Sequence, residues 1–207
     1  MAVDYSLYLI TDRELVGPRD FLASVRRALE GGVTLLQVRE KVVSSREFYD
    51  IGLKLKALAA EFAIPLIVND RVDLALSLDA DGVHIGQEDL PLETVRRIIG
   101  KDKLLGYSVS NIEEAVYGEK RGADYLGAGP VYPTGSKPDA GRAIGIEGLE
   151  AIRERVNIPV VGIGGIGPAN LNQVKGTGIA GISVISAILS QPDPYQAAKE
   201  LSDLWKS

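Results

Sequence analysis

The stretch GADYLGAGPVYPTGSKPDAGR, residues 122–142, contains the two features that decide the fold of this chain, a short buried strand and a long loop directly after it. Residues 123–127 (ADYLG) predict a short buried β-strand. The remainder is interrupted by glycine and proline at short intervals and predicts a long irregular loop. Such a loop in a compact chain is usually functional or disordered. Here Thr134, Ser136 and Lys137 have side chains that can bind phosphate oxygens, which favours function.

The same order, an apolar run followed by an amphipathic segment, recurs on both sides of this stretch. Short apolar runs predict strands over residues 6–10, 33–39, 65–68, 82–85, 104–108, 125–127, 159–163 and 181–184. Helical periodicity and helix-end signals predict helices over residues 18–30, 45–62, 72 onward, 92–99, 112–121, 146–156, 168–174 and 193–206. Eight strand–helix units predict an α/β fold: a single (β/α)8 TIM barrel domain over residues 1–207, with parallel strands inside and helices outside.

An open, doubly wound sheet is the alternative fold. That fold normally has a glycine-rich phosphate turn after its first strand. In this chain Thr11, Asp12 and Arg13 follow the first strand, and the glycine-dense turn comes after the seventh. The position of the glycines therefore favours the barrel.

Composition limits the kinds of function. The chain has 207 residues, 45% of them hydrophobic, and a net charge of -5, which does not suit nucleic-acid binding. It has no cysteine and a single histidine, His84, so disulfides, thiolate nucleophiles, multi-histidine metal sites and histidine-based triads are excluded. We interpret His84, which lies within an expected strand, as a hydrogen-bonded core residue. No signal peptide or membrane-spanning run is visible, and we expect a cytoplasmic protein that binds no membrane.

Polar residues at the carboxyl ends of the strands are the candidates for an active site, because such barrels carry their sites there. In the second strand Gln37, Arg39 and Lys41 share one face, since side chains alternate along a strand. An inward-pointing arginine needs an anionic partner, which favours a site for a diphosphate. The alternative is that all three side chains point toward the outer helices or solvent.

Two aspartates follow neighbouring strands, Asp70 after the third and Asp89 after the fourth. Carboxylates in such positions can hold one Mg²⁺ that also binds substrate phosphates. Both residues could instead be ordinary helix N-caps, and the two interpretations stay open. Ser108, at the end of the fifth strand, is a further candidate for the mouth of the barrel.

A second anion site is expected after the seventh and eighth strands. Glycines that include Gly165 precede a short helix, and their amides can point at a phosphate, unless they only form a tight turn. Ile185 and Ser186 would complete this site. No nucleophile–base pair is visible. This favours a reaction in which a diphosphate leaves with electrostatic stabilisation and a ready nucleophile attacks.

These motifs resemble the thiamine-phosphate synthase family, also called thiamine-phosphate pyrophosphorylase. The resemblance runs from YLITD at 8–12 to VISAI at 184–188. Its most specific parts are QVREK at 37–41, NDR at 69–71, GVHIGQEDLP at 82–91, GPVYPTGSKPDA at 129–140 and IGGI at 163–166. The family joins hydroxymethylpyrimidine diphosphate to hydroxyethylthiazole phosphate. Pyrophosphate leaves first, and the thiazole nitrogen captures the pyrimidine methylene cation.

The resemblance implies roles for individual residues. The pyrimidine diphosphate would be bound by Gln37, Val38, Arg39, Glu40, Lys41, Asn69, Ser108 and Lys137, of which Arg39, Lys41, Ser108 and Lys137 would be catalytic. The thiazole phosphate would be bound by Thr134, Gly135, Ser136, Gly165, Ile185 and Ser186. Asp70 and Asp89 would bind Mg²⁺, the expected cofactor.

Two other functions stay open at this point. A related thiazole tautomerase shares the barrel but moves a proton, and the resemblance gives it a histidine in the loop after the sixth strand. This chain has Gly129, Pro130 and Val131 there. A non-catalytic phosphate-ligand sensor would not need the full set of charged residues. The sequence does not decide the oligomeric state, and a homodimer stays open.

Overall fold

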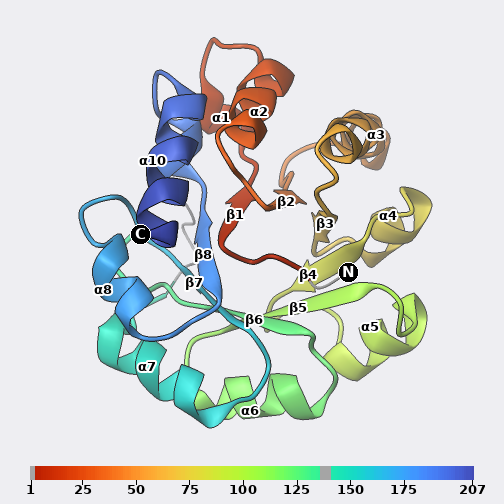
Figure 1. Ribbon diagram of the computed structural model, residues 1–207. Helices are drawn as coiled ribbons and strands as arrows, with labels where there is room; N and C mark the ends of the chain where they lie inside the picture. The colour runs from red at the N-terminus through yellow and green to blue at the C-terminus, as the bar shows by residue number, and fades with distance from the viewer. Residues whose placement is uncertain (1–2, 136–140) are drawn as a thin grey trace.

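The computed structural model describes residues 3–135 and 141–207, which fold into a ring of parallel strands enclosed by helices (Figure 1). Each strand pairs with the next one in chain order, and β8 pairs with β1, so the sheet is closed. The strands of this barrel are β1 (Leu7–Ile10), β2 (Leu35–Val38), β3 (Leu66–Asn69), β4 (Gly82–Ile85), β5 (Leu104–Val109), β6 (Tyr125–Ala128), β7 (Val160–Ile163) and β8 (Gly181–Val184). The predicted (β/α)8 TIM barrel is confirmed, and the alternative open sheet is wrong.

Helices cover the outside of the barrel. In the described part of the chain they are α1 (Arg13–Val16), α2 (Phe21–Glu30), α3 (Ser45–Glu61), α4 (Val72–Ser77), α5 (Leu92–Ile99), α6 (Ile112–Lys120), α7 (Gly145–Arg155), α8 (Leu171–Gly176), α9 (Ser186–Leu189) and α10 (Pro194–Lys206). None of these helices has the length and apolar character needed to cross a membrane.

Capping side chains set two helix starts that differ from the expected ones. The short helix α1 was not expected, because one turn is too short to show a hydrophobic period. It begins where the Asp12 carboxylate accepts hydrogen bonds from the amides of Glu14 and Leu15. Helix α2 begins at Phe21 rather than near Pro18, because the carboxylate of Asp20 caps it.

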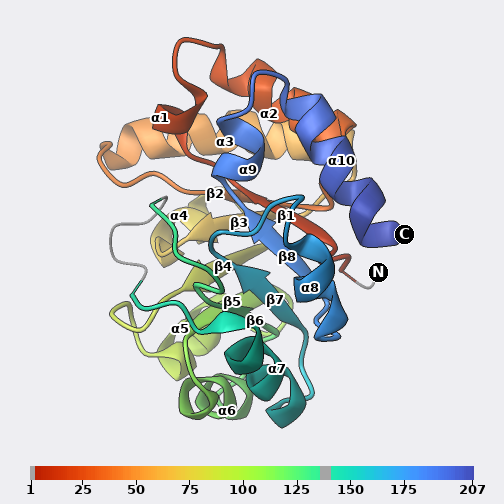
Figure 2. The same ribbon diagram turned by 90° about the vertical axis from the view of Figure 1, so that its left-hand side faces the viewer.

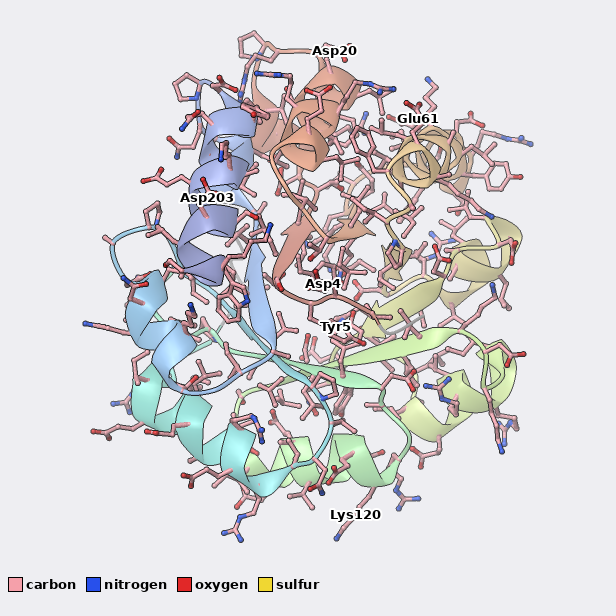
Figure 3. The ribbon with its side chains drawn as sticks, in the orientation of Figure 1. Asp4, Tyr5, Asp20, Glu61, Lys120 and Asp203 are labelled. Atoms are coloured by element: carbon pink, nitrogen blue, oxygen red, sulfur yellow. The ribbon has the colours of Figure 1, made fainter. Side chains whose placement is uncertain are left out.

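The side chains of the strands pack on both sides of the sheet. Those that point outward form the main core beneath the helices, with Leu36 and Val38 of β2 as examples. Those that point inward belong to a second cluster inside the barrel, made of Tyr5, Tyr8, Leu35, Ile67, Tyr125 and Val161. Tyr5 lies over the centre of the ring, before the first strand (Figure 3). The barrel interior is therefore filled with side chains and is not a pore.

The two ends of the barrel differ. Figure 2 shows α1 and α9 at one end and the C-terminal end of α10 at the other. At this second end Arg96 of α5 joins the loops that precede two strands. Its guanidinium donates to the carbonyl of Gly122 at 2.8 and 3.1 Å. It also donates to the carbonyls of Gly100 and Lys103, each at 2.8 Å.

Replacement of Arg96 with alanine is expected to destabilise the fold without touching the opposite end. Arg96→Ala should lower the free energy of unfolding by about 2–4 kcal/mol, because several carbonyl groups lose a charged donor. Urea denaturation followed by circular dichroism measures this change. Arg97→Ala is the matched control, because Arg97 is exposed on the same helix and has no side-chain partner among the described residues. Equal losses in the two variants would show that the loop contacts of Arg96 contribute nothing.

Candidate active site

A cavity of about 1450 Å³ opens where the strands lead into their following loops. This is the end of the barrel at which the sequence placed the site. The predicted site residues that line the cavity are Arg39, Lys41, Asn69, Asp70, Asp89, Ser108, Thr134, Gly165, Ile185 and Ser186. Closure of the barrel thus brings together residues that are far apart in the sequence.

Arg39 is a buried cation whose ion pair within the described residues, with Asp12, is a long one. Its residue is 9% exposed, and its backbone amide is held by the hydroxyl of Thr11 at 3.1 Å. In the described part of the chain its ion-pair partner is Asp12, whose carboxylate lies 3.6 Å from Nη1, longer than a hydrogen bond. Its Nε has no hydrogen-bond partner among the described residues. Burying a charge in this way is costly, so the guanidinium is well suited to an anionic ligand.

The side chains of Val38 and Glu40 point away from the large cavity, and the assignment of these two residues to the pyrimidine diphosphate stays a prediction. Side chains alternate along β2, so these two point away from the side that Arg39 occupies. Val38 packs in the core beneath the helices. The Glu40 carboxylate forms an ion pair with Arg13 of α1, at 3.0 Å. Burial raises the pKa of Glu40, although the charge of Arg13 opposes the shift.

Gln37 lies below the cavity, inside the barrel. Its residue is 1% exposed, and its Nε2 donates to the phenol of Tyr8. It lines a second, small cavity of about 20 Å³ together with His84, Ser108 and Ser183. Gln37 Oε1 and Ser183 Oγ are buried there without a hydrogen-bond partner in the described part of the chain. The sequence predictions did not include Ser183, although alternation along β8 could have indicated an inward side chain.

Ser108 lines both cavities and connects them to the barrel interior. Its hydroxyl lies 2.9 Å from Nε2 of His84, and Nδ1 of His84 lies 3.0 Å from the phenol of Tyr125. These contacts confirm the interpretation of His84 as a hydrogen-bonded core residue. The carbonyl of Ser108 accepts a hydrogen bond from Gln87 at 2.6 Å. Gln87 also lines the large cavity and was not among the predicted site residues.

Asp70 and Asp89 stand beside each other at one wall of the cavity. Burial raises the pKa of Asp89, the amide of Gly86 opposes this, and the negative charge of Asp70 raises the pKa further. Lys41 Nζ contacts Asp70 Oδ2 at 2.9 Å. Asp70 has a φ of 59°, a left-handed conformation that aspartate tolerates better than most residues. The site is therefore a pair of carboxylates that repel each other unless a cation lies between them.

The alternative role of these aspartates, as helix caps, is wrong. The N-cap residue of α4 is Arg71 and that of α5 is Pro91, and neither helix start has a side-chain cap. The described residues contain no group of three or more histidine, cysteine or acidic residues around one metal position. A cation here would therefore have two protein carboxylates and would take further ligands from water or phosphate. Mg²⁺ is usually coordinated in this way.

The opposite wall is built from the loops after β6 and β7. The amide of Val131 donates to the carbonyl of Ile163 at 2.8 Å, and the amide of Tyr132 donates to that of Gly164 at 3.0 Å. Gly165 has a φ of 64°, and a Cβ there would meet the carbonyl oxygen of Pro133 at 2.8 Å. Glycine is therefore required at 165 by both its conformation and the close approach of the two loops.

The remaining predicted residues lie near this wall. Ser186 is the first residue of α9 and Ile185 precedes it, so both stand where the chain leaves β8. Gly135 follows Thr134 but does not line the cavity. Ser136 and Lys137 lie outside the described residues.

The fold and the site define a (β/α)8 barrel protein with a charged cavity at its strand ends. A family model described as thiamine monophosphate synthase matches residues 7–188. A thiamine-phosphate synthase of Desulfitobacterium hafniense (strain Y51) is 72% identical over 207 residues, covering 100% of both chains. A thiamine-phosphate synthase of Syntrophomonas wolfei is 48% identical over 98% of this chain and 97% of that protein. A solved thiamine phosphate pyrophosphorylase from Pyrococcus furiosus is 48% identical with a TM-score of 0.91, covering 99% of this chain and 96% of that one.

The chain therefore belongs to the thiamine-phosphate synthase family, whose members are transferases of thiamine biosynthesis. This is the family that the sequence motifs resemble, and the prediction is confirmed.

Proposed function

We propose that the chain joins hydroxymethylpyrimidine diphosphate to hydroxyethylthiazole phosphate, giving thiamine phosphate and pyrophosphate. The observation that carries this proposal is that Arg39, Lys41, Asp70 and Asp89 line one cavity, in which Lys41 Nζ lies 2.9 Å from Asp70 Oδ2. Cations and a carboxylate pair together suit a magnesium diphosphate rather than a lone phosphate. Three expectations from the sequence remain predictions: a single domain over residues 1–207, a cytoplasmic location and small-molecule partners. A homodimer also stays open.

The diphosphate is proposed to lie on the wall that carries Arg39 and Lys41. The family resemblance also assigns to it Gln37, Val38, Glu40, Asn69, Ser108 and Lys137. Asp70 and Asp89 would hold Mg²⁺, which when bound supplies positive charge that stabilises the leaving group. Arg39 supports this proposal most directly, because the Nε of its buried guanidinium has no hydrogen-bond partner among the described residues. The guanidinium is in place before the charge develops, which is what stabilisation of a leaving group requires.

The pyrimidine ring is proposed to lie above the small interior cavity. Gln37 Oε1 and Ser183 Oγ have no partner there among the described residues, and both border that space. An aminopyrimidine can donate to the first and contact the second, so the ligand would satisfy groups that the protein alone leaves unsatisfied. In this way Gln37 acts on the substrate from below the floor of the large cavity.

The thiazole phosphate is proposed to lie on the opposite wall. The contacts would come from Thr134, Gly135, Ser136, Gly165, Ile185 and Ser186, as the resemblance implies. The backbone hydrogen bonds between the loops after β6 and β7 support this placement, because they hold Thr134 and Gly165 on one wall of the cavity. The two substrates would then meet between the walls.

The proposed reaction requires no general base. The thiazole nitrogen has a free electron pair and attacks the methylene cation after pyrophosphate has left. A tautomerase would need an acid–base residue in the loop after β6, where this chain has Gly129, Pro130 and Val131. A phosphate sensor would have no use for a carboxylate pair beside a buried arginine. Both alternatives are therefore less well supported than the synthase.

Purified protein is expected to release pyrophosphate only when both substrates and Mg²⁺ are present. A coupled pyrophosphate assay measures the release, and mass spectrometry of the same mixture identifies thiamine phosphate. Omission of the thiazole phosphate is the control for simple hydrolysis of the diphosphate. Absence of release, combined with isomerisation of a thiazole phosphate, would replace the synthase by the tautomerase. Absence of both activities with intact ligand binding would favour the sensor.

A further inference from the structure

A chain of hydrogen bonds crosses the interior of the barrel between two residues assigned to the pyrimidine diphosphate. It begins at Gln37 on β2, whose Nε2 donates to Tyr8 Oη on β1. The phenols of Tyr8 and Tyr125, from β1 and β6, are 2.9 Å apart. Tyr125 Oη lies 3.0 Å from Nδ1 of His84, and Nε2 of His84 lies 2.9 Å from Ser108 Oγ. Tyr8, Tyr125 and His84 have no assigned role in the proposed reaction.

The two tyrosines and the histidine of this hydrogen-bond chain are buried. Tyr125 is 0% exposed, Tyr8 is 2% exposed and His84 is 7% exposed. Burial raises the pKa of both tyrosine phenols, so each keeps its proton at neutral pH. Each phenol can therefore donate one hydrogen bond, and the order of donors along the chain is restricted.

The amide of Gln37 sets this order. Because its nitrogen donates to Tyr8, the proton of Tyr8 is free to go to Tyr125, and the proton of Tyr125 then goes to Nδ1 of His84. In the reverse order Tyr8 would accept from both neighbours. Its own buried proton would then have no acceptor among the described residues, which is unfavourable.

We infer that Tyr8 and Tyr125 are positioning residues, which hold His84 in the tautomer protonated on Nε2 and so turn the Ser108 hydroxyl into a donor toward the cavity. His84 then donates to Ser108 Oγ, and the proton of Ser108 is left for a ligand in the cavity. This inference rests on the proposed function, because it takes the departing diphosphate as the group that receives the proton of Ser108 in a hydrogen bond. A donor fixed in advance stabilises charge that develops on a leaving group.

The tautomer is directly measurable because His84 is the single histidine of the chain. In untagged protein labelled with nitrogen-15 histidine, a two-dimensional spectrum shows one imidazole, whose two nitrogen shifts identify the protonated atom. We expect protonation on Nε2 in the wild type. Tyr125→Phe removes the donor to Nδ1, so a population protonated on Nδ1 should appear. A wild-type imidazole protonated on Nδ1, or an unchanged spectrum of the variant, would overturn the inference.

Kinetics supply the second readout. Tyr125→Phe is expected to lower kcat about 10-fold or more, while KM for the thiazole phosphate stays unchanged, because the lost effect acts on the leaving group. Tyr5→Phe is the matched control, since its ring lies 5.1 Å from that of Tyr125 in the same cluster. Among the described residues the Tyr5 hydroxyl makes no hydrogen bond to Tyr8, Tyr125 or His84, so both kcat and the tautomer should remain those of the wild type. Equal losses in the two variants would indicate a packing effect and contradict the inference.

A second variant and a spectrum without substrates test the inference even if Tyr125→Phe does not fold or the protein is inactive. If Tyr125→Phe does not fold, Tyr8→Phe interrupts the same chain one hydrogen bond earlier and should change kcat and the tautomer in the same direction. The spectrum is recorded without substrates, so it does not depend on the activity. A wild type with the expected tautomer and no pyrophosphate release would refute the proposed function alone. Normal release with unaffected Tyr8→Phe and Tyr125→Phe would refute the positioning role alone.

Discussion

Replacement of Arg39 with alanine is expected to lower kcat for pyrophosphate release at least about 100-fold. The guanidinium is buried at the cavity. Among the described residues its ion pair with Asp12 is long, at 3.6 Å, and its Nε has no hydrogen-bond partner. The proposed diphosphate is the anion that would bind this guanidinium. Steady-state kinetics with both substrates measure the effect. Arg39→Lys keeps the charge but loses the planar fork, so its kcat should fall between those of the wild type and the alanine variant.

A structural role for Arg39 would give a different result. The ion pair with Asp12 is long, at 3.6 Å, and desolvation offsets much of its attraction, so ligand-free Arg39→Ala should retain a melting temperature close to that of the wild type. Arg97→Ala, which removes an exposed arginine of α5, is the control for the loss of one positive charge and should retain full kcat. A large fall in stability of Arg39→Ala, or a wild-type kcat, would show that the diphosphate is bound elsewhere.

The second large effect is expected for the carboxylate pair. Asp70→Asn and Asp89→Asn should each lower kcat by about 100-fold or more, because the site loses the charge that would hold Mg²⁺ beside the leaving group. Asparagine keeps the size of the side chain, and it tolerates the left-handed backbone of Asp70. A readout that does not depend on turnover is the melting temperature in the presence of Mg²⁺ and pyrophosphate. Mg²⁺ and pyrophosphate, added together, should raise the melting temperature of the wild type and raise that of either variant much less.

The pH dependence of stability distinguishes repulsion from a structural contact. The pKa of Asp89 is raised in the fold, by burial first and by Asp70 in addition, so its ionisation disfavours folding. Without ligand, wild-type stability should therefore fall as pH rises from the ordinary aspartate pKa through the raised one. Asp89→Asn should lack this fall and should be no less stable than the wild type at neutral pH. A marked loss of stability at neutral pH would mean that Asp89 acts mainly through its bond to Gly86.

The sequence predicts the order of strands and helices well, because short apolar runs and helical periods are local. The strands at Gly82–Ile85 and Gly181–Val184 have the same limits in the prediction and in the structure. The start of α2 differs because it depends on one side-chain hydrogen bond, from the amide of Ala23 to Asp20. A single capping contact of this kind leaves little trace in hydrophobic periodicity.

From the sequence, site residues can be predicted only when they lie at the carboxyl end of a predicted strand. Asp70 and Asp89 were found by that rule, but whether they cap helices depends on where α4 and α5 begin. Glu40 was assigned to the pyrimidine diphosphate as part of the motif at residues 37–41. Its ion-pair partner Arg13 lies on α1, a helix too short to show a hydrophobic period. The contact between Tyr8 and Tyr125 joins residues 117 positions apart across the barrel. Local sequence patterns carry no information on such a pair.

The position of the C-terminal end of α10, away from α1 and α9, has a practical consequence (Figure 2). Helix α10 begins beside the cavity, at Asp193 and Pro194, and carries the chain to the far end of the barrel. A fluorescent protein fused after Ser207, or a linker to a solid support, would therefore project away from the cavity. Substrates would keep free access to an immobilised enzyme.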